Sequence, residues 1–244
     1  MNVLITGASG MLGKALLNLN ANGMNFLTPT KKEMDIRDSS QVSDYFKNNK
    51  IDAVIHCAAI AKVKQCDLDS ENALFTNING TSNVVKEAFN LKGIRFIYIS
   101  TDYVYPCTEG NYSEEDLAIP FTLYGWTKLA GECVVRAIEN HCIIRTSFFD
   151  KNNIPFSDAP SDAFSSKIEI RDLAKAILLL TASNFKGIIN VGQEKKSLYD
   201  LYKKYKPEIK ESSIKDLSNQ RARDSSMNVL VWRTLSENIQ KEIN

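Results

Sequence analysis

The chain has 244 residues, of which 43% are hydrophobic, and its 30 Lys and Arg nearly balance its 29 Asp and Glu. A chain of this length can bury a substantial core, so we expect one domain, or one domain with a small lobe. The formal net charge of +1 gives no electrostatic reason for binding nucleic acid or an anionic membrane.

The apolar runs are short, and the cysteines follow no metal-binding pattern. No window approaches the ~18 apolar residues of a membrane span, and residues 1–5 form a strand-like run rather than a secretory signal. The five cysteines lack C-x-x-C spacing, which predicts reduced thiols and no metal site. We therefore expect a cytoplasmic protein.

Short apolar runs alternate with segments of helical period. This pattern is typical of a parallel sheet covered by helices on both faces. Strands are expected at residues 3–6, 25–28, 53–56, 95–100, 142–145 and 188–191. Helices are expected at residues 12–19, 40–47, 72–91, 127–139 and 172–181.

The alternation weakens at residues 148–167 and again from residue 194, where prolines and polar residues interrupt it. The sequence thus predicts an α/β fold with a Rossmann-type, doubly wound parallel sheet over residues 1–147. Residues 148–244 are expected to form a small, shortened C-terminal substrate lobe. This lobe is interleaved with the last core elements at about 168–192.

A glycine-rich turn follows the first strand and opens directly into a helix. Glycines in a G-x-x-G-x-x-G turn let the backbone approach a pyrophosphate, whose charge the helix amino terminus stabilises. An ordinary glycine-rich bend has the same spacing, but the position at the first strand–helix junction favours a nucleotide site. The expected cofactor contacts in this turn are Gly7, Ser9, Gly10, Met11, Leu12 and Gly13.

The segment after the second strand bears on the choice of nicotinamide cofactor. Residues 26–32 contain no carboxylate for the ribose hydroxyls. Lys31 and Lys32 suit a 2′-phosphate, which favours NADPH and leaves NADH open, although such lysines are also typical of a solvated surface. The remaining cofactor contacts are expected from Asp35, Ile36, Ala58 and Ala59.

Tyr124 and Lys128 are four residues apart and therefore share one face of a helix that is expected to start near them. A neighbouring ammonium lowers the pKa of a phenol from ~10, which would help Tyr124 to protonate a carbonyl oxygen as hydride arrives. Thr101 ends the fourth strand, at the edge where ligands bind in open α/β folds. The alternative is a snorkelling lysine and a strand-end turn that satisfies only its own backbone.

Together these motifs resemble the extended short-chain dehydrogenase/reductases, most closely the nucleotide-sugar 4-ketoreductases that are similar to dTDP-4-dehydrorhamnose reductase. The most specific segments are S-T-D-Y-V-Y at 100–105 and Y-G-W-T-K-L-A-G-E at 124–132. The others are G-A-S-G-M-L-G at 7–13, M-D-I-R-D at 34–38, V-I-H-C-A-A at 54–59, N-I-N-G-T at 77–81 and R-T-S at 145–147.

The resemblance implies reduction of a nucleotide-activated 4-keto-6-deoxysugar, with Thr101, Tyr124 and Lys128 as the catalytic triad. Tyr124, Lys128 and Asn77 would also contact the cofactor, and Asn77 would support the active site from the preceding helix. It also suggests a homodimer. Arg221 and Arg223 suit a diphosphate, because arginine pairs bidentately with phosphate oxygens. The expected substrate contacts are Asp102, Tyr103, Val104 and Arg223.

Two other functions stay open. An epimerase or dehydratase has the same fold, but dehydratases usually carry an acidic pair after the strand-four Thr, and here Asp102 is followed by Tyr103. The family also includes a non-catalytic relative that regulates methionine adenosyltransferase, so a dinucleotide-binding regulatory subunit is the second alternative. Residues 148–169 match no family element, and this leaves the exact substrate open.

Overall fold

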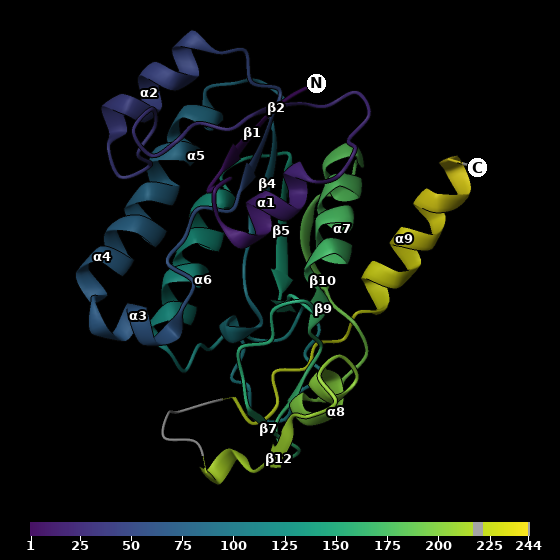
Figure 1. Cartoon of the computed structure of the whole chain (residues 1–244). Coiled ribbons are helices and arrows are strands. Elements are labelled where there is room, and N and C mark those ends of the chain that lie inside the picture. The colour runs from purple at the N-terminus through teal and green to yellow at the C-terminus, as the bar shows by residue number, and fades with distance from the viewer. Residues whose placement is uncertain (217–221, 244) are drawn as a thin grey trace.

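The computed structural model of the chain describes residues 1–216 and 222–243, with side chains described as far as residue 239. Its centre is a six-stranded parallel sheet between two layers of helices (Figure 1). The strands, in spatial order, are β10 (Gly187–Val191), β5 (His141–Thr146), β4 (Arg95–Ile99), β3 (Ala53–His56), β1 (Asn2–Thr6) and β2 (Asn25–Leu27). The predicted α/β, Rossmann-type class is confirmed.

Helices cover both faces of the sheet because side chains alternate along each strand. Val3 and Ile5 point to one face and Leu4 to the other. The first face packs against α1 (Met11–Leu17) and α7 (Ile170–Ala182). The second face is covered by α2 (Ser39–Asn48), α5 (Thr81–Phe89) and α6 (Leu123–Val135).

The direction of winding reverses between β1 and β3. β1 pairs with β2 on one side and with β3 on the other, so Thr6 lies opposite His56. Loops that leave such neighbouring strands in opposite directions open a crevice at the carboxyl edge of the sheet, where ligands bind in folds of this type. The glycine-rich turn after β1 therefore begins at this crevice.

The helix expected at residues 72–91 is broken into shorter pieces. These pieces are the end of α4 (Ser70–Leu74), a π-helical turn η1 (Phe75–Gly80) and α5, and a further short helix, α3 (Val63–Leu68), precedes them. Asp69 caps α4 by accepting a hydrogen bond from the amide of Asn72. The π-helical turn, a rare conformation that is frequent at functional sites, places Asn77 against the loop after β3.

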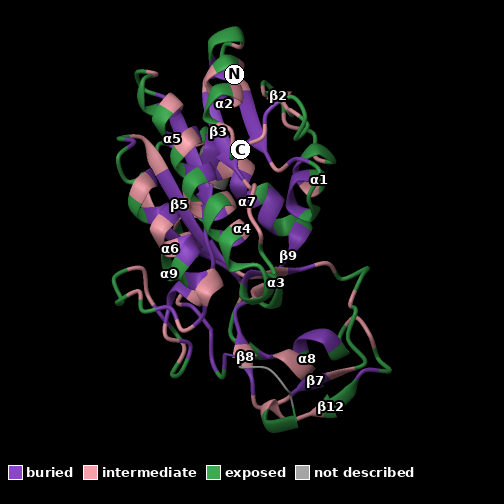
Figure 2. Cartoon of the chain, turned by 90° about the vertical axis from the view of Figure 1, so that its left-hand side faces the viewer, coloured by how far each residue is buried: buried purple, intermediate pink, exposed green. Residues whose placement is uncertain are grey.

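A small lobe lies beyond the carboxyl edge of the sheet (Figures 1 and 2). The pair β6 (Phe148–Phe149) and β9 (Ile168–Glu169) stands where the chain leaves the core and returns to it. The lobe has its own apolar core, which includes Phe149, Leu201 and Tyr202. Its elements are β7 (Asp158–Pro160), β8 (Phe164–Ser165), β11 (Lys196–Ser197), α8 (Leu198–Lys203), β12 (Lys210–Ser212) and a 3₁₀ turn η3 (Ile214–Asp216).

The last helix, α9 (Leu230–Ile243), returns from the lobe to the side of the sheet and projects from it (Figure 1). Trp232 and Leu235 pack against the core beside β10 and α7. Within the described residues, no helix combines the length and the apolar composition needed to cross a bilayer.

Candidate active site

A cavity of about 470 Å³ opens at the carboxyl ends of β1, β4 and β5, on the side of the small lobe. It adjoins a second cavity of about 290 Å³ above the crevice between β1 and β3. Gly7, Gly10, Cys57 and Ala59 line both cavities. The two cavities thus form one elongated site, whose larger end lies at the expected catalytic residues and whose smaller end lies at β2.

Bare backbone forms the floor of this site. Gly7 has a φ of +70°, and a Cβ atom there would lie 2.7 Å from Cα of Ala58. A Cβ atom on Gly13 would lie 2.5 Å from Cα of Ala8, so α1 packs directly on the turn. Since no side chain fits at Gly7 without displacing the end of β3, the site leaves backbone groups open to a pyrophosphate. The residues present therefore fit a dinucleotide.

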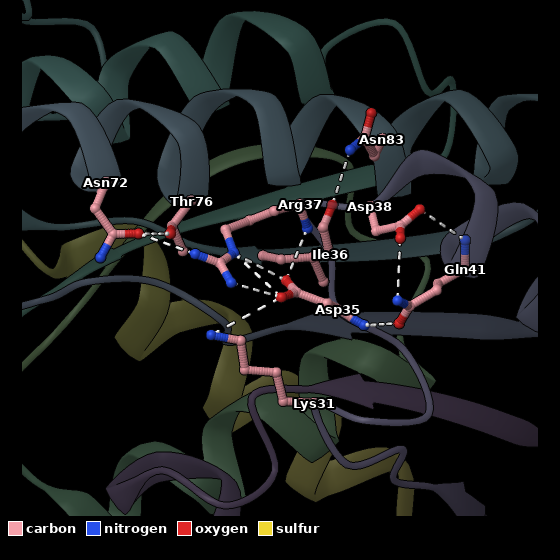
Figure 3. Close-up of polar contacts among 9 residues, drawn as sticks. All are labelled: Lys31, Asp35, Ile36, Arg37, Asp38, Gln41, Asn72, Thr76 and Asn83. Atoms are coloured by element: carbon pink, nitrogen blue, oxygen red, sulfur yellow. Dashed lines mark hydrogen bonds and ion pairs between the residues drawn. The ribbon is translucent and has the colours of Figure 1, made fainter.

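At its smaller end, the site is bordered by a cluster of charged side chains (Figure 3). The guanidinium of Arg37 binds Asp35 through Nε at 3.1 Å and Nη2 at 2.7 Å. Its Nη1 donates to Asn72 at 3.2 Å. Lys31 lies 3.8 Å from the Asp35 carboxylate. The Arg37 hydrogen bonds lower the pKa of Asp35, so this carboxylate stays charged and is shared between two cations.

The expected cofactor residues differ in where they lie. Ser9, Lys31, Asp35, Ile36 and Ala58 line the smaller cavity, whereas Met11, Leu12 and Gly13 line the larger one. Lys32 is exposed and lines neither cavity. Arg37 also lines the smaller cavity and was not predicted as a site residue. Its position within M-D-I-R-D was the available signal.

Thr101, Tyr124 and Lys128 are brought together on one wall of the larger cavity. The hydroxyl of Thr101 donates to the Asp102 carboxylate at 3.0 Å and accepts from the Tyr103 amide at 3.2 Å, at the start of the 3₁₀ turn η2 (Asp102–Val104). Tyr124 lies in the first turn of α6, and Lys128 lies one turn later on the same face.

Burial governs the ionisation of the tyrosine and the lysine. It raises the pKa of Tyr124 above the ordinary value of 10, while the hydroxyl of Thr101 works in the other direction. Burial lowers the pKa of Lys128 to about 7, although the negative charge of Glu132 acts to raise it. The Lys128 ammonium lies over the ring of Tyr98, 4.1 Å from its centroid. The expected lowering of the Tyr124 pKa is thus corrected, because desolvation dominates both groups.

Asn77 lies behind the site rather than in it. Its side chain is fully buried, donates to the Ile60 carbonyl at 3.0 Å and to the Thr127 hydroxyl at 2.9 Å, and accepts from the Ile60 amide at 2.8 Å. It lines neither cavity. Asn77 thus ties η1 and the loop after β3 to α6, next to Lys128, and its expected contact with the cofactor stays a prediction.

A buried polar network lies directly behind the wall that carries Thr101, Tyr124 and Lys128, the expected catalytic residues. Arg145 on β5 binds Glu132 on α6 through two hydrogen bonds of 3.0 and 2.8 Å. Ser100 donates to the same carboxylate at 2.5 Å, and Arg145 also donates to the Tyr105 hydroxyl at 3.0 Å. This network joins α6 to β4 and β5. This network was not predicted from the sequence, although charged residues within apolar elements were a signal.

The expected substrate residues are also separated. Asp102 and Tyr103 line the larger cavity. Val104 is fully buried in an apolar cluster outside both cavities, so its side chain is directed away from the site. Arg223 is exposed and lines neither cavity, and Arg221 lies outside the described residues. Lys167 lines the larger cavity and was not predicted, because its segment carried no recognisable motif.

Comparison with known proteins decides the family. Residues 1–156 match the family described as the RmlD substrate binding domain. The chain belongs to this family. Another match, the spore coat polysaccharide biosynthesis protein SpsK of Bacillus subtilis, is 32% identical over 195 residues, which cover 73% of this chain and 69% of that protein.

Two further relatives of this RmlD-family chain point to different functions. The methionine adenosyltransferase 2 subunit beta of Rattus norvegicus is 36% identical over 147 residues, which cover 57% of this chain and 43% of that protein. The chain thus spans less than half of that curated relative. The dTDP-4-dehydrorhamnose reductase of Bacillus anthracis, solved in complex with NADP, superposes with a TM-score of 0.85 at 28% identity and covers 96% of this chain and 92% of that one.

Proposed function

We propose that the protein uses NADPH to reduce the keto group of a nucleotide-activated 4-keto-6-deoxysugar. The observation that carries this proposal is the placement of Thr101, Tyr124 and Lys128 on a cavity that continues into the glycine-floored crevice. The RmlD family and the NADP-bound reductase of Bacillus anthracis support it.

In this proposal, the bound nicotinamide supplies a hydride to the carbonyl carbon. The hydroxyls of Thr101 and Tyr124 hold the carbonyl oxygen, and Tyr124 donates its proton as negative charge develops there. Tyr124 keeps its proton at neutral pH, because burial holds its pKa above the ordinary value of 10, and in this proposal it gives up that proton only as the carbonyl oxygen gains negative charge. Lys128 follows one helical turn later on α6, and in this proposal its ammonium holds the nicotinamide ribose.

The preference for NADPH rests on the cations at the smaller end of the site. Lys31 and Arg37 both line this cavity. Asp35 partly neutralises both of them. Because Arg37 holds its carboxylate, we do not expect Asp35 to accept hydrogen bonds from the ribose hydroxyls of NADH. A 2′-phosphate adds negative charge where two cations are available, whereas NADH offers only hydroxyl groups.

A regulatory subunit is the second candidate, favoured by the relative from Rattus norvegicus. An epimerase or dehydratase of the same fold is a third possibility, weakened by the Asp102-Tyr103 pair. Homodimer formation and a cytoplasmic location stay predictions.

The test is NADPH oxidation by the purified protein with freshly made dTDP-4-keto-6-deoxyhexose, followed by absorbance. We expect turnover by the wild type, and a loss on the order of a hundredfold or more for Tyr124→Phe, which keeps the ring but removes the proton donor. NADPH binding without turnover by the wild type would instead favour the regulatory candidate.

A further inference from the structure

Lys167 stands where the larger cavity of the active site meets a separate cavity in the small lobe. This lobe cavity has a volume of about 160 Å³, and its lining includes the aromatic side chains of Phe156, Phe164 and Tyr202. Lys167 and Tyr103 line both cavities. A ligand that extends from the catalytic wall into the lobe therefore passes Lys167.

The backbone holds Lys167 firmly at this junction. The amide of Ile168 donates to the carbonyl of Ser147 at 2.9 Å, in line with the parallel pairing of β6 and β9. This pairing sets Lys167 beside Ser147, and its ammonium donates to the Ser147 hydroxyl at 2.7 Å. Among residues 1–216 and 222–243, with side chains through 239, no carboxylate lies within 4.0 Å of this ammonium. Lys167 thus makes no direct ion pair in this described part, although its charge acts through space on the buried carboxyl group of Asp102 and opposes the rise that burial causes in the pKa of that group.

Other cations near the two cavities are placed differently. Arg145 is bound to a buried glutamate, and Lys195 has an ion pair of its own. Lys62 lines only the larger cavity and is exposed, while Arg223 lines neither. Of the basic residues in the described part of the chain, Lys167 is the one that reaches both cavities.

A buried hydroxyl provides a second, independent sign of a polar ligand. Ser165 lies two residues before Lys167, is 3% exposed and lines the lobe cavity. Its Oγ atom has no hydrogen-bond partner among the described residues. Because an unsatisfied buried hydroxyl is costly, such a group in a cavity wall indicates a partner supplied from outside the chain.

We propose that Lys167 is a specificity-determining residue that binds the diphosphate of the sugar-nucleotide substrate. This inference rests on the proposed function, because the diphosphate is joined to the sugar at C1, across the ring from the C4 keto group held by Tyr124. With the keto group on the catalytic wall and the nucleoside in the lobe cavity, the diphosphate lies at the junction. Lys167 thus replaces Arg223 as the phosphate-binding residue.

The first test measures binding to the NADPH-loaded protein by titration calorimetry, with dTDP as the probe. Lys167→Met should weaken dTDP binding on the order of ten- to a hundredfold, as expected for loss of a charged hydrogen bond. Lys167→Arg should retain most of the affinity. Lys175→Met, on the exposed side of α7, should match the wild type, and NADPH affinity should be unchanged in all three variants.

Unchanged dTDP affinity in Lys167→Met, a parallel loss of NADPH and dTDP affinity, or a wild type that does not bind dTDP would each overturn the proposal. Turnover separates this proposal from the proposed function. If the protein binds dTDP through Lys167 but reduces no keto sugar, the diphosphate site is supported and the proposed reductase function is wrong. If the protein reduces the keto sugar and Lys167→Met leaves the KM for the sugar nucleotide unchanged, the reductase function is supported and the diphosphate site is wrong.

Discussion

At the residue scale, backbone geometry and desolvation determine what the site can do. Gly7 matters because its missing Cβ atom leaves the end of β1 in contact with the backbone of Ala58. Lys128 matters because the protein surrounds its ammonium and lowers its pKa to about 7. The spacing of residue types located both residues. It could not predict the close backbone contact at Gly7 or the burial of Lys128.

Gly7→Ala should abolish cofactor binding and destabilise the fold. The new methyl group would lie 2.7 Å from the Ala58 backbone at a φ of +70°. Gly23→Ala is the matched control, because Gly23 also has a positive φ of +77° but nothing within 4 Å of the added atom. The control should lose only the ~1–2 kcal/mol of left-handed strain. Urea unfolding and NADPH titration measure both effects, and equal losses in the two variants would contradict the steric explanation.

The depressed pKa of Lys128 predicts a pH-dependent stability. Between pH 7 and the unfolded-state pKa near 10.5, the unfolded chain binds more protons at this residue than the native protein does. The free energy of unfolding should therefore gain a contribution that rises with pH across this window. Comparing urea unfolding of the cofactor-free wild type and Lys128→Met from pH 6 to 10 isolates this contribution. Parallel pH profiles would show that Lys128 is not desolvated.

At the element scale, α6 carries Tyr124 and Lys128, the proposed catalytic pair, and is fixed by the polar network behind it. Thr122 caps its first turn, and Gly131 lets it approach Tyr98, since a Cβ atom there would lie 2.0 Å from the phenol oxygen. The ion pair between Glu132 and Arg145 then joins this helix to β5. The positions of Tyr124 and Lys128 therefore depend on buried residues that do not line the site.

Glu132→Gln should destabilise the protein by about 3–5 kcal/mol, because it leaves the buried guanidinium of Arg145 without its counter-charge. Glu139→Gln breaks the exposed pair with Lys186 and should cost less than about 1 kcal/mol. Urea unfolding of the two variants at pH 7 compares them directly. Similar losses would mean that burial of the pair contributes little.

At the scale of the whole molecule, the sequence predicted the core better than the lobe. Alternating apolar runs are a local signal, and they located the strands of the central sheet and the crevice beside Gly7. The lobe is built from two- and three-residue strands paired across long stretches of chain, such as β7 with β12. Strands this short are too brief to show a hydrophobic period in the sequence, and their partners lie far away along the chain. Lys167 was missed for this reason. Val104 was missed because it is buried in a cluster with Met227 and Val229, which lie far away in the sequence.

The charged end of the site gives a prediction about cofactor choice. Lys31→Ala and Arg37→Ala should each weaken NADPH binding on the order of tenfold or more and leave NADH binding nearly unchanged, because only NADPH carries the 2′-phosphate. Lys32→Ala, an exposed neighbour outside both cavities, is the control. Equal losses for the two cofactors would contradict a phosphate-binding role.

The central claim, net hydride transfer to a sugar nucleotide, is tested most directly with NADPH deuterated at the transferable position. The wild-type protein is mixed with dTDP-4-keto-6-deoxyhexose, and the product is analysed by mass spectrometry and NMR. The proposal predicts a single deuterium on C4 of the product sugar, with an equal amount of NADP⁺ formed. An unlabelled sugar with intact, bound NADPH would contradict it.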